Sequence, residues 1–385
     1  MSRLTDKRAP DQGPQMPPLP VVDWKRIGQS APVVLPFDYQ GPDAPLPAAD
    51  MVVITWTNAE WSAFDHVFCN SGQPRTEKDT AWQTDWKQYA KGAPPPPSSG
   101  TDYHLWGYYR MVQITGQSGQ PITILLFKAN THLAYSPYLD GLLTMTNAIL
   151  DDTQARCLYS IGTAGGVGEA DLLGNTVVTN SGHLYMTNSN NAGSPLNNQT
   201  FTCAQWFPPF DWVEQTQQEL LYPLSNVATW KQYDLLFAQL QQKMAESQPP
   251  VDMSGITVDD LVNRPLNPTN LHQPAIANCK DKPLLTTDFY YIAQPGDAEK
   301  YCILEMDDAV LGAASGEKGV AYAFVRNVSD PVVPSITSSG AAIPDAVRNE
   351  WSSLIYDTFG FYTSYNGALA AWATIAAMPM GQQSI

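Results

Sequence analysis

The chain has 385 residues, and its 21 Lys and Arg residues stand against 37 Asp and Glu residues, which gives a formal net charge of −16. A protein that neutralises the phosphates of a polymeric nucleic acid needs a basic face, so this acidic balance argues against such a partner. Hydrophobic residues make up 43% of the chain and aromatic residues 11%, which is enough for a core and excludes disorder of the whole chain.

Proline-rich stretches dominate residues 1–48, where APDQGPQMPPLP is followed by PFDYQGPDAPLP. Such stretches form neither a regular helix nor a central strand, so we expect an arm or a wrapping segment. A single domain then spans 49–385, with insertions at about 70–105 and 196–285, although the length fits two domains equally well. The first insertion carries several Trp and Tyr residues, which predicts that it packs on the body.

The body opens with a short apolar strand at 51–55, and Asn58 follows as the predicted cap of a helix. Strands at 108–115 and 121–127 flank the turn sequence GQSGQ, which predicts a hairpin. These elements begin the pattern of strands and helices that the rest of the chain continues.

Later elements alternate between helix and strand. The clearest is a helix in the second insertion, where apolar residues from Trp230 to Met244 recur every three or four positions. That stripe predicts core packing, with an oligomer contact as the alternative. The alternation predicts an α/β fold in which helices cover both faces of a largely parallel or mixed sheet. The other predicted elements are helices at 138–151, 304–315 and 365–378 and strands at 157–161, 176–180, 287–292 and 321–325.

No apolar run reaches the roughly 18 residues of a membrane span. The first residues lack the apolar stretch of a secretory signal, so we expect a cytoplasmic protein. The five cysteines and five histidines are scattered, and no C-x-x-C pair occurs. This pattern predicts small, buried cysteines and neither a metal site nor a cofactor.

Polar segments that directly follow predicted strands are candidates for a binding site, because ligands of open α/β sheets collect at the carboxyl ends of the strands. One such segment is the glycine-rich loop Gly162–Gly168, where backbone amides can approach a ligand closely. Its spacing is not G-x-G-x-x-G and no Walker lysine follows, so a dinucleotide site and a P-loop are both excluded. A tight turn that binds nothing is the equal alternative.

Two acidic residues occupy positions that suit acid–base chemistry. Asp330 comes soon after the predicted strand at 321–325, where partial desolvation would raise its pKa and suit a general acid. A turn or cap before Pro331 is the alternative. Glu60 lies in the first turn of a predicted helix, where it is either favoured by the helix dipole or serves as a base in the cleft.

Three carboxylates stand together at the start of an otherwise apolar predicted helix. They belong to Glu305, Asp307 and Asp308, with Met306 among them. Burying such groups costs free energy unless they accept hydrogen bonds, and a diol ligand would supply suitable donors.

Five segments, taken in order, resemble the purine nucleoside phosphorylase and uridine phosphorylase superfamily. They are VVITWTNAEWSAF (52–64), LYSIGTAGGVGEADLLGNTVVT (158–179), TTDFYYIA (286–293), ILEMDDAVLGAA (303–314) and AFVRNVSDP (323–331). The order and spacing of SIGTAGG, LEMDD and VRNVSD make the match specific. The chain is most similar to the hydrolytic branch, the methylthioadenosine/adenosylhomocysteine nucleosidases, and this implies a mixed central sheet flanked by helices.

The resemblance implies a catalytic pair. Asp330 is similar to the aspartate that protonates the purine N7 as the glycosidic bond breaks, and Glu60 to the first-helix glutamate that activates the attacking water. This chemistry is coherent, because cleavage of an N-ribosidic bond passes through an oxocarbenium-like state that needs an acid at the leaving base and a nucleophile at the anomeric carbon.

The resemblance also implies a set of substrate-binding residues. Met306 and Asp307 resemble the pair that packs against the ribose and binds its hydroxyls. Phe289, with Tyr290 beside it, resembles the aromatic residue that stacks on the base. The residues expected to line the base and sugar pocket are Thr163, Ala164 and Gly165.

Two departures from the family pattern bear on the reaction. Phosphorylases carry an arginine just ahead of the glycine loop, where this chain has Ser160, and their second phosphate-binding arginine also lacks a counterpart. Their absence removes most of the attraction for inorganic phosphate, so water is the expected nucleophile. Asp307 is one methylene shorter than the family's ribose-binding glutamate, so Glu305 or Asp308 is the alternative partner of the sugar.

Lys128 and His132 follow a predicted strand in KANTHLAY, where the resemblance predicts a glycine-containing turn. We expect both to be solvated surface residues, with contact to a substrate phosphate as the alternative. A pair such as Lys128 and Arg326 would serve a single phosphate despite the acidic balance.

The sequence thus predicts a nucleosidase that hydrolyses the N-glycosidic bond of a purine nucleoside or nucleotide. The alternatives are a phosphate-dependent phosphorylase, a non-catalytic nucleoside-binding member of the fold, and an effector that depletes a nucleotide pool when a signal activates it. The expected partners are a small-molecule nucleoside or nucleotide and further copies of the chain in a homo-oligomer, with no membrane and no polymeric nucleic acid.

Overall fold

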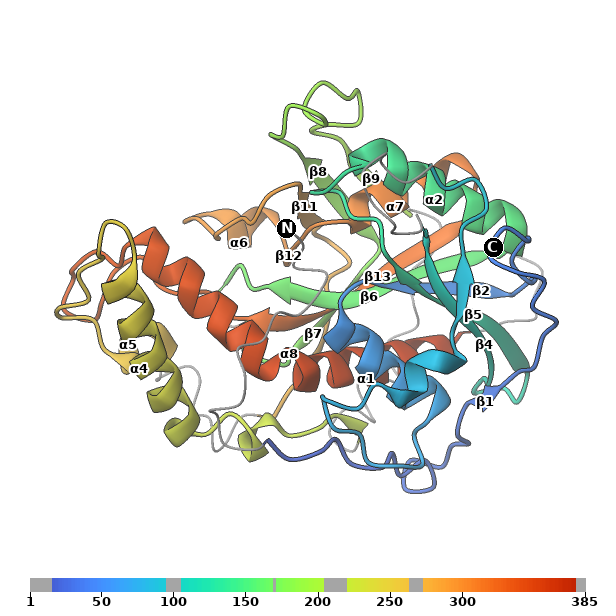
Figure 1. Ribbon diagram of the computed structural model, residues 1–385, viewed down its shortest axis with the longest axis horizontal. Coiled ribbons are helices and arrows are strands. Elements are labelled where there is room, and N and C mark those ends of the chain that lie inside the picture. Colours follow the sequence, from blue (N-terminus) through green and yellow to red (C-terminus); the bar gives the residue numbers. More distant parts are fainter. Residues whose placement is uncertain (1–15, 95–104, 169–170, 204–219, 263–272, 379–385) are drawn as a thin grey trace.

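The computed structural model describes residues 16–94, 105–168, 171–203, 220–262 and 273–378. A mixed β-sheet runs through the middle of the molecule, and helices lie on both of its faces (Figure 1). The predicted α/β fold with a mixed central sheet flanked by helices is therefore confirmed.

Four parallel strands form the centre of the sheet. β2 (Met51–Thr55) pairs with β5 (Pro121–Ala129) and with β6 (Cys157–Gly165), and β6 pairs in turn with β13 (Ala321–Asp330). Every residue of β2 is buried, and so is every residue of β13 except Asp330. Continuous burial of this kind is typical of parallel strands covered on both faces. Because the four strands run in one direction, their carboxyl ends meet at one edge of the sheet.

The remaining strands widen the sheet on both sides. β4 (Gly107–Thr115) pairs antiparallel with β5, which confirms the predicted hairpin. The strand order is β1-β4-β5-β2-β6-β12-β11-β8-β9, and β13 pairs with both β6 and β7. The strands not yet given are β1 (Val33–Val34), β3 (Lys87–Tyr89), β7 (Thr176–Thr179), β8 (Ser181–Tyr185), β9 (Thr200–Thr202), β10 (Ile276–Asn278), β11 (Leu284–Thr287) and β12 (Leu304–Glu305).

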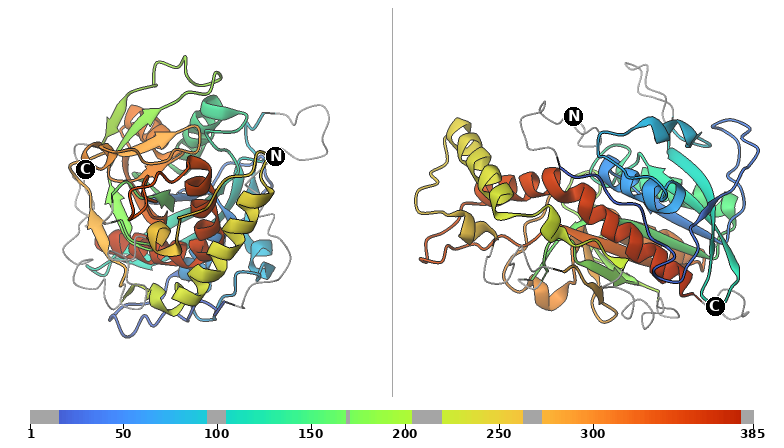
Figure 2. Two further views of the ribbon diagram at one scale, coloured as in Figure 1. Left: turned by 90° about the vertical axis from the view of Figure 1, so that its left-hand side faces the viewer. Right: turned by 90° about the horizontal axis from the view of Figure 1, so that it is seen from below.

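Two pairs of helices cover the two faces of the sheet. α1 (Asn58–Cys69) and the long α8 (Asp345–Ala376) share one apolar cluster with the sheet, and α2 (Tyr138–Thr153) and α7 (Asp308–Glu317) share another (Figures 1 and 2). The shorter helices are α5 (Val258–Val262), α6 (Asp297–Lys300), η1 (Ala81–Asp85) and η2 (Leu224–Asn226).

The helix predicted in the second insertion is α4 (Trp230–Glu246), and it packs against α8 (Figure 2). The ring of Tyr233 lies 6.3 Å from that of Trp351 and 5.6 Å from that of Phe359, measured between centroids. The prediction that this apolar stripe packs in the core is therefore confirmed.

The first insertion also packs on the body, as its aromatic residues predict. The rings of Trp82 and Trp86 stand edge-on to that of Trp61 in α1, with centroids 4.9 and 5.4 Å away. The described part of the proline-rich arm lies along the body as well, because Leu19 forms a backbone bridge with Arg75. The rest of the arm and residues 95–104 lie outside the described residues.

Several predicted boundaries are wrong. The cap of α1 is Thr57 rather than Asn58, because the hydroxyl of Thr57 accepts from Glu60 N while the Glu60 carboxylate accepts from Thr57 N. The strand predicted at 287–292 ends at Thr287, and the helix predicted from 304 starts only at Asp308. The predicted strands 157–161 and 321–325 run on to Gly165 and Asp330, and the predicted C-terminal helix starts at Asp345 rather than 365.

All five cysteines are free. Cys157 and Cys302 are buried, but the other three are half-buried, so the prediction of burial is wrong for those three. Among the described residues, no helix is both long enough and apolar enough to cross a membrane.

Gly107 allows β4 to approach β5 closely, so Gly107→Ala should weaken the hairpin. A Cβ atom at this position would lie 2.0 Å from the carbonyl oxygen of Lys128 and 2.7 Å from the Phe127 ring. Crowding of this kind costs about 1–3 kcal/mol of the free energy of unfolding, which urea denaturation measures. Gly72→Ala is the matched control, because a Cβ there meets nothing within 4 Å. Equal stability of the two variants would show that the strands do not need this close approach.

Candidate active site

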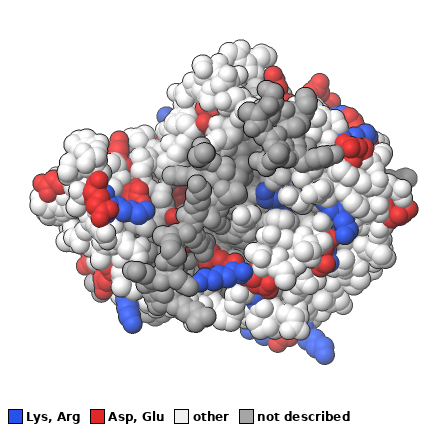
Figure 3. All heavy atoms as spheres, viewed as in Figure 1, with Lys and Arg blue, Asp and Glu red and all other residues white. Residues whose placement is uncertain are grey.

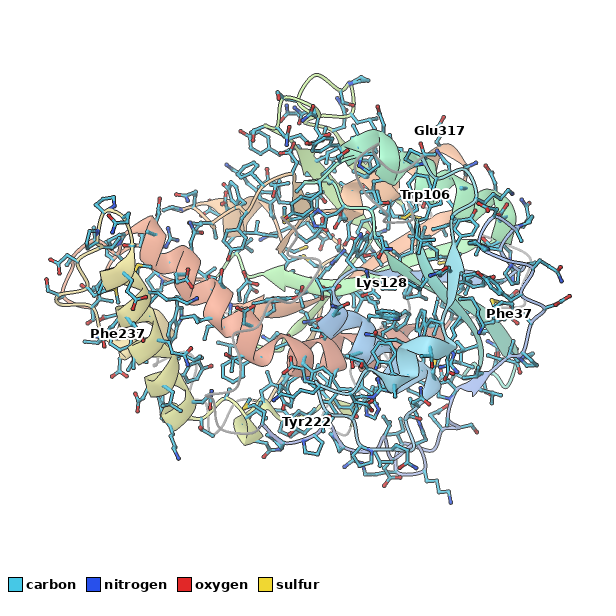
Figure 4. The ribbon with its side chains drawn as sticks, in the orientation of Figure 1. Phe37, Trp106, Lys128, Tyr222, Phe237 and Glu317 are labelled. Atoms are coloured by element: carbon cyan, nitrogen blue, oxygen red, sulfur yellow. The ribbon has the colours of Figure 1, made fainter. Side chains whose placement is uncertain are left out.

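The carboxyl ends of β2, β5, β6 and β13 bring together most of the predicted site residues. Glu60 follows β2, Thr163 and Gly165 end β6, and Asp330 ends β13. Lys128, near the end of β5, lies at the centre of the view in Figure 4. In the register of the sheet, Gly165 pairs with Asp330.

Glu60 is buried and its carboxylate accepts hydrogen bonds from five donors. Oε2 accepts from the backbone N–H groups of Trp56 (3.0 Å) and Thr57 (2.9 Å) and from the hydroxyl of Thr55 (3.2 Å). Oε1 accepts from the backbone N–H and the hydroxyl of Thr163, at 2.8 and 2.6 Å. The side chain therefore joins the start of α1 to the end of β6, in addition to any chemical role.

Arg326 is the buried cation of this edge. Its Nε donates to Asp308 Oδ2 at 2.7 Å, its Nη2 contacts the other oxygen of the same carboxylate, and Nη2 lies 3.3 Å from Glu305 Oε2. Burial opposes the charge of the guanidinium, but the carboxylates of Asp308 and Glu305 raise the pKa of Arg326 above its ordinary value. Nη2 also donates to the hydroxyl of Ser160 at 2.8 Å.

Gly162 makes room for this arginine. A Cβ at position 162 would lie 2.3 Å from Arg326 Nη1 and 3.1 Å from Glu60 Oε1. The first glycine of the predicted loop therefore lies in β6, where it allows the Arg326 side chain to approach the backbone closely. The prediction of a tight turn from Gly162 is wrong, because β6 continues through Gly165.

Glu305 caps the start of α7. Its carboxylate accepts from the backbone N–H of Asp307 at 2.6 Å and of Asp308 at 3.0 Å, and it contacts the hydroxyl of Thr286. Burial, together with the nearby charge of Asp308, raises the pKa of Glu305. Asp308 and Glu305 are thus occupied by protein partners, which leaves Asp307 as the carboxyl of this group with the fewest protein partners.

Asp307 is held by residues from the segment after β5. Its Oδ1 accepts from the backbone N–H of Leu133 at 2.9 Å, and its Oδ2 lies 3.4 Å from His132 Nε2. Burial raises the pKa of Asp307 to about 8 and lowers that of His132 to about 4, so the imidazole is neutral at pH 7. Because the backbone N–H of Ala134 donates to His132 Nδ1 (3.1 Å), the ring proton is assigned to Nε2, which faces Asp307.

Asp330 has the environment that the sequence predicted for an acid. Desolvation raises the pKa of its carboxyl to about 6, although the hydroxyls of Ser329 and Tyr290 lower it in part. These hydroxyls donate to Oδ1 at 2.7 Å and to Oδ2 at 3.2 Å. A Cβ at Gly165 would lie 3.3 Å from Oδ2, so the glycine avoids a tight contact with this carboxyl.

The remaining predicted residues surround these groups. Phe289 is half-buried, with its ring edge-on to those of Tyr185 and Tyr291 at 6.2 and 5.9 Å, and Tyr290 is 40% exposed. Met306 is half-buried between β12 and α7, and Ala164 is buried in β6. Thr163 and Gly165 are two positions apart on β6, which separates these two residues by about 6–7 Å along the strand.

Three side chains of the site, Lys128, His132 and Arg326, were considered in the sequence only as possible contacts of a phosphate. Lys128 is only 5% exposed and the side chain of His132 14% exposed, so the prediction that both are solvated is wrong. Arg326 is bound to carboxylates and is therefore not available to pair with Lys128 around a phosphate. The position of Arg326 inside the apolar segment AYAFVRNVS indicated that this side chain is buried. No local pattern in the sequence relates His132 to Asp307.

No group of three His, Cys, Asp or Glu side chains with the geometry of a metal site occurs among the described residues. A cavity of about 510 Å³ lies between α2, α7 and β9, and none of the predicted site residues lines it. Glu317, which lines this cavity, is labelled in Figure 4. On the face in Figure 3, Lys and Arg are scattered among Asp and Glu, and the described residues form no extended basic patch there.

No protein-family model and no curated protein matches the chain. Its structure is similar to solved nucleosidase structures. The 5'-methylthioadenosine/S-adenosylhomocysteine nucleosidase of Neisseria meningitidis is 11% identical, with a TM-score of 0.43, over 86% of this chain and 100% of that chain. Futalosine hydrolase of Helicobacter pylori is 10% identical (TM-score 0.42; 85% and 97%), and the S-adenosylhomocysteine nucleosidase of Streptococcus pyogenes is 11% identical (TM-score 0.42; 88% and 100%).

Proposed function

We propose that the chain is a nucleosidase that hydrolyses the N-glycosidic bond of a purine nucleoside or nucleotide and releases the free base. The observation that carries this proposal is the pair of Asp330 and Glu60 at the carboxyl ends of β13 and β2, the two strands that flank β6. One is a desolvated carboxyl with a raised pKa, and the other is a carboxylate that accepts five hydrogen bonds. The two groups suit opposite tasks, proton donation and activation of water.

Asp330 is the proposed general acid. With a pKa of about 6 it carries a proton in a useful fraction of molecules near neutral pH, and Gly165 beside it presents no side chain to a leaving base. Protonation of the base nitrogen neutralises the electron pair that it takes from the breaking bond. Phe289 and Tyr290, on the segment after β11, are the proposed stacking residues for the base.

Glu60 is the proposed base that activates water. Its five donors fill the acceptor capacity of the carboxylate, so one donor must turn away before a water molecule can bind. The hydroxyls of Thr55 and Thr163 are able to rotate, whereas the backbone N–H groups are fixed. Thr163 is two residues before Gly165, the partner of Asp330 in the register of the sheet, so a water that replaces its hydroxyl would stand on the same strand end as the proposed acid.

Asp307 is the proposed partner of the ribose hydroxyls, with Met306 packed against the sugar and Ala164 in the pocket wall. The neutral His132 and the Leu133 N–H hold the shorter side chain of Asp307. Glu305 caps α7 and has no free oxygen to offer, which argues for Asp307 as the sugar ligand. That the protein acts in the cytoplasm and as a homo-oligomer stays a prediction of the sequence.

Hydrolysis is favoured over phosphorolysis by the charges around Ser160. The guanidinium that lies beside this hydroxyl belongs to Arg326, and two carboxylates already neutralise it. A neutralised arginine attracts inorganic phosphate weakly.

The proposal is tested by chromatography of the free base released from purine nucleosides and nucleotides, with and without inorganic phosphate. We expect release that does not require phosphate and yields the free sugar or sugar phosphate. Release of ribose 1-phosphate only when phosphate is added would contradict hydrolysis, and intact substrates throughout would contradict the nucleosidase.

Asp330→Asn should lower kcat by about 10²–10⁴-fold, because the amide keeps the shape of the side chain but has no proton to give. Thermal unfolding should show little change. Asp234→Asn on the exposed surface of α4 is the control and should keep its activity. Full activity of Asp330→Asn would remove Asp330 from the role of acid.

The activity should fall as the pH rises through about 6, because the protonated form of Asp330 is then lost. Its pKa is raised by desolvation, and the Tyr290 hydroxyl lowers it in part by donating to the carboxylate. Tyr290→Phe should therefore move this limb of the kcat/KM profile to higher pH. A limb that stays in place, or moves to lower pH, would show that another group sets it.

A further inference from the structure

Lys128 is a buried cation without a carboxylate partner among the described residues. It is 5% exposed, and its Nζ donates to the neutral amide oxygen of Asn130 at 2.6 Å. No ion pair between described residues includes it, whereas the neighbouring Arg326 contacts both Asp308 and Glu305. No described carboxylate is therefore within ion-pair distance of the ammonium, and the charge of Glu60 compensates it only in part.

A second buried donor lies near Lys128, and this one has no acceptor among the described residues. The ammonium of Lys128 lies over the ring of Trp61, 5.8 Å from its centroid. The indole N–H of Trp61 is buried and has no hydrogen-bond partner in the described part of the chain. Buried donors without acceptors cost free energy, so a ligand that accepts from both groups would recover that cost.

The position of Lys128 links it to the proposed reaction centre. In the register of the sheet it lies beside Thr55, whose hydroxyl donates to Glu60. Burial lowers the pKa of Lys128 to about 8, and the charge of Glu60 opposes this shift in part. At pH 7 the side chain is therefore mostly an ammonium, adjacent to the carboxylate that is proposed to activate water.

We propose that Lys128, together with the Trp61 N–H, binds a phosphate oxyanion at the carboxyl end of β5, beside Glu60. A phosphate group fits because its several acceptor oxygens can satisfy two donors at once and its charge compensates the ammonium. The inference rests on the proposed function for its biological meaning. The oxyanion belongs either to the phosphoryl group of a nucleotide substrate or to free inorganic phosphate.

The first measurement is binding, which does not depend on turnover. Inorganic phosphate and a purine nucleoside 5′-monophosphate are titrated against the protein while its thermal unfolding is followed, with potassium chloride at equal ionic strength as the reference. Both phosphates should raise the midpoint of the wild-type protein. Lys128→Met should abolish the rise without unfolding the protein, because it keeps the volume of the side chain and removes a buried charge. Trp61→Phe should reduce the rise.

Lys231→Met removes an exposed lysine of α4 and is the matched control. It should respond to phosphate like the wild type. The response of the wild type should also fade above about pH 8, where Lys128 loses its proton. A lysine that serves only packing would not produce this dependence on pH.

The second measurement separates the two sources of the oxyanion. If Lys128 holds the substrate's own phosphoryl group, Lys128→Met should raise KM for the nucleotide about 10- to 100-fold more than it raises KM for the nucleoside. If it holds free phosphate, the variant should lose phosphate-dependent release from the nucleoside. In that case a phosphate oxygen bonds to the anomeric carbon as the glycosidic bond breaks, and Asp330 supplies the proton to the base.

Wild-type protein that phosphates do not stabilise, or Lys128→Met that they stabilise equally, would overturn this inference. Either result leaves the proposed nucleosidase intact if base is still released. Conversely, phosphate binding that depends on Lys128 in a protein that releases no base would overturn the proposed function alone.

Discussion

A single guanidinium holds the carboxyl edge of this sheet together. Arg326 reaches across Gly162 and contacts the carboxylates of Asp308 and Glu305, while Glu305 fixes the first N–H groups of α7. Removing one partner of a buried ion pair costs about 3–5 kcal/mol, because the remaining charge loses its compensation. We therefore expect the positions of Asp307, Thr163 and the neighbouring strand ends to depend on the ion pairs of Arg326 with Asp308 and Glu305.

Around Arg326 and its two carboxylate partners, the protein places other carboxyl side chains in different surroundings. Burial raises the pKa of Asp307 and Asp330, and the carboxylate of Glu60 accepts hydrogen bonds from backbone N–H groups and two hydroxyls. These surroundings differ because each strand end supplies a different number of backbone N–H donors to the carboxyl group beside it. The Glu60 carboxylate accepts from two hydroxyls, and a neutral imidazole lies beside Asp307. These side-chain groups are able to rotate, whereas the backbone donors of the site are fixed.

The sequence predicted the strands and helices of the core, since β2 and β13 are apolar runs and α4 has a helical stripe. The predicted ends of strands were wrong where pairing with a strand that is distant in the sequence determines them. The β6 strand continues through Gly165 because β13 pairs with it along its length, and no local glycine pattern reveals such pairing. The roles of His132 and Lys128 depend on contacts to Asp307 and Trp61, far away in the chain, so a local pattern pointed to the surface instead.

The proline-rich arm has a consequence for the order in which the protein folds. The carbonyl of Pro17 accepts from the Tyr362 hydroxyl at 2.6 Å, and the ring of Trp24 lies 4.6 Å from that of Trp372, so the arm docks on α8. Ribosomes add roughly 5–20 residues per second, which separates these two segments by tens of seconds during synthesis. The arm must therefore wait, undocked, until the last long helix has been made. Completion of the apolar cluster under α8 is a late event that joins the beginning of the chain to its end.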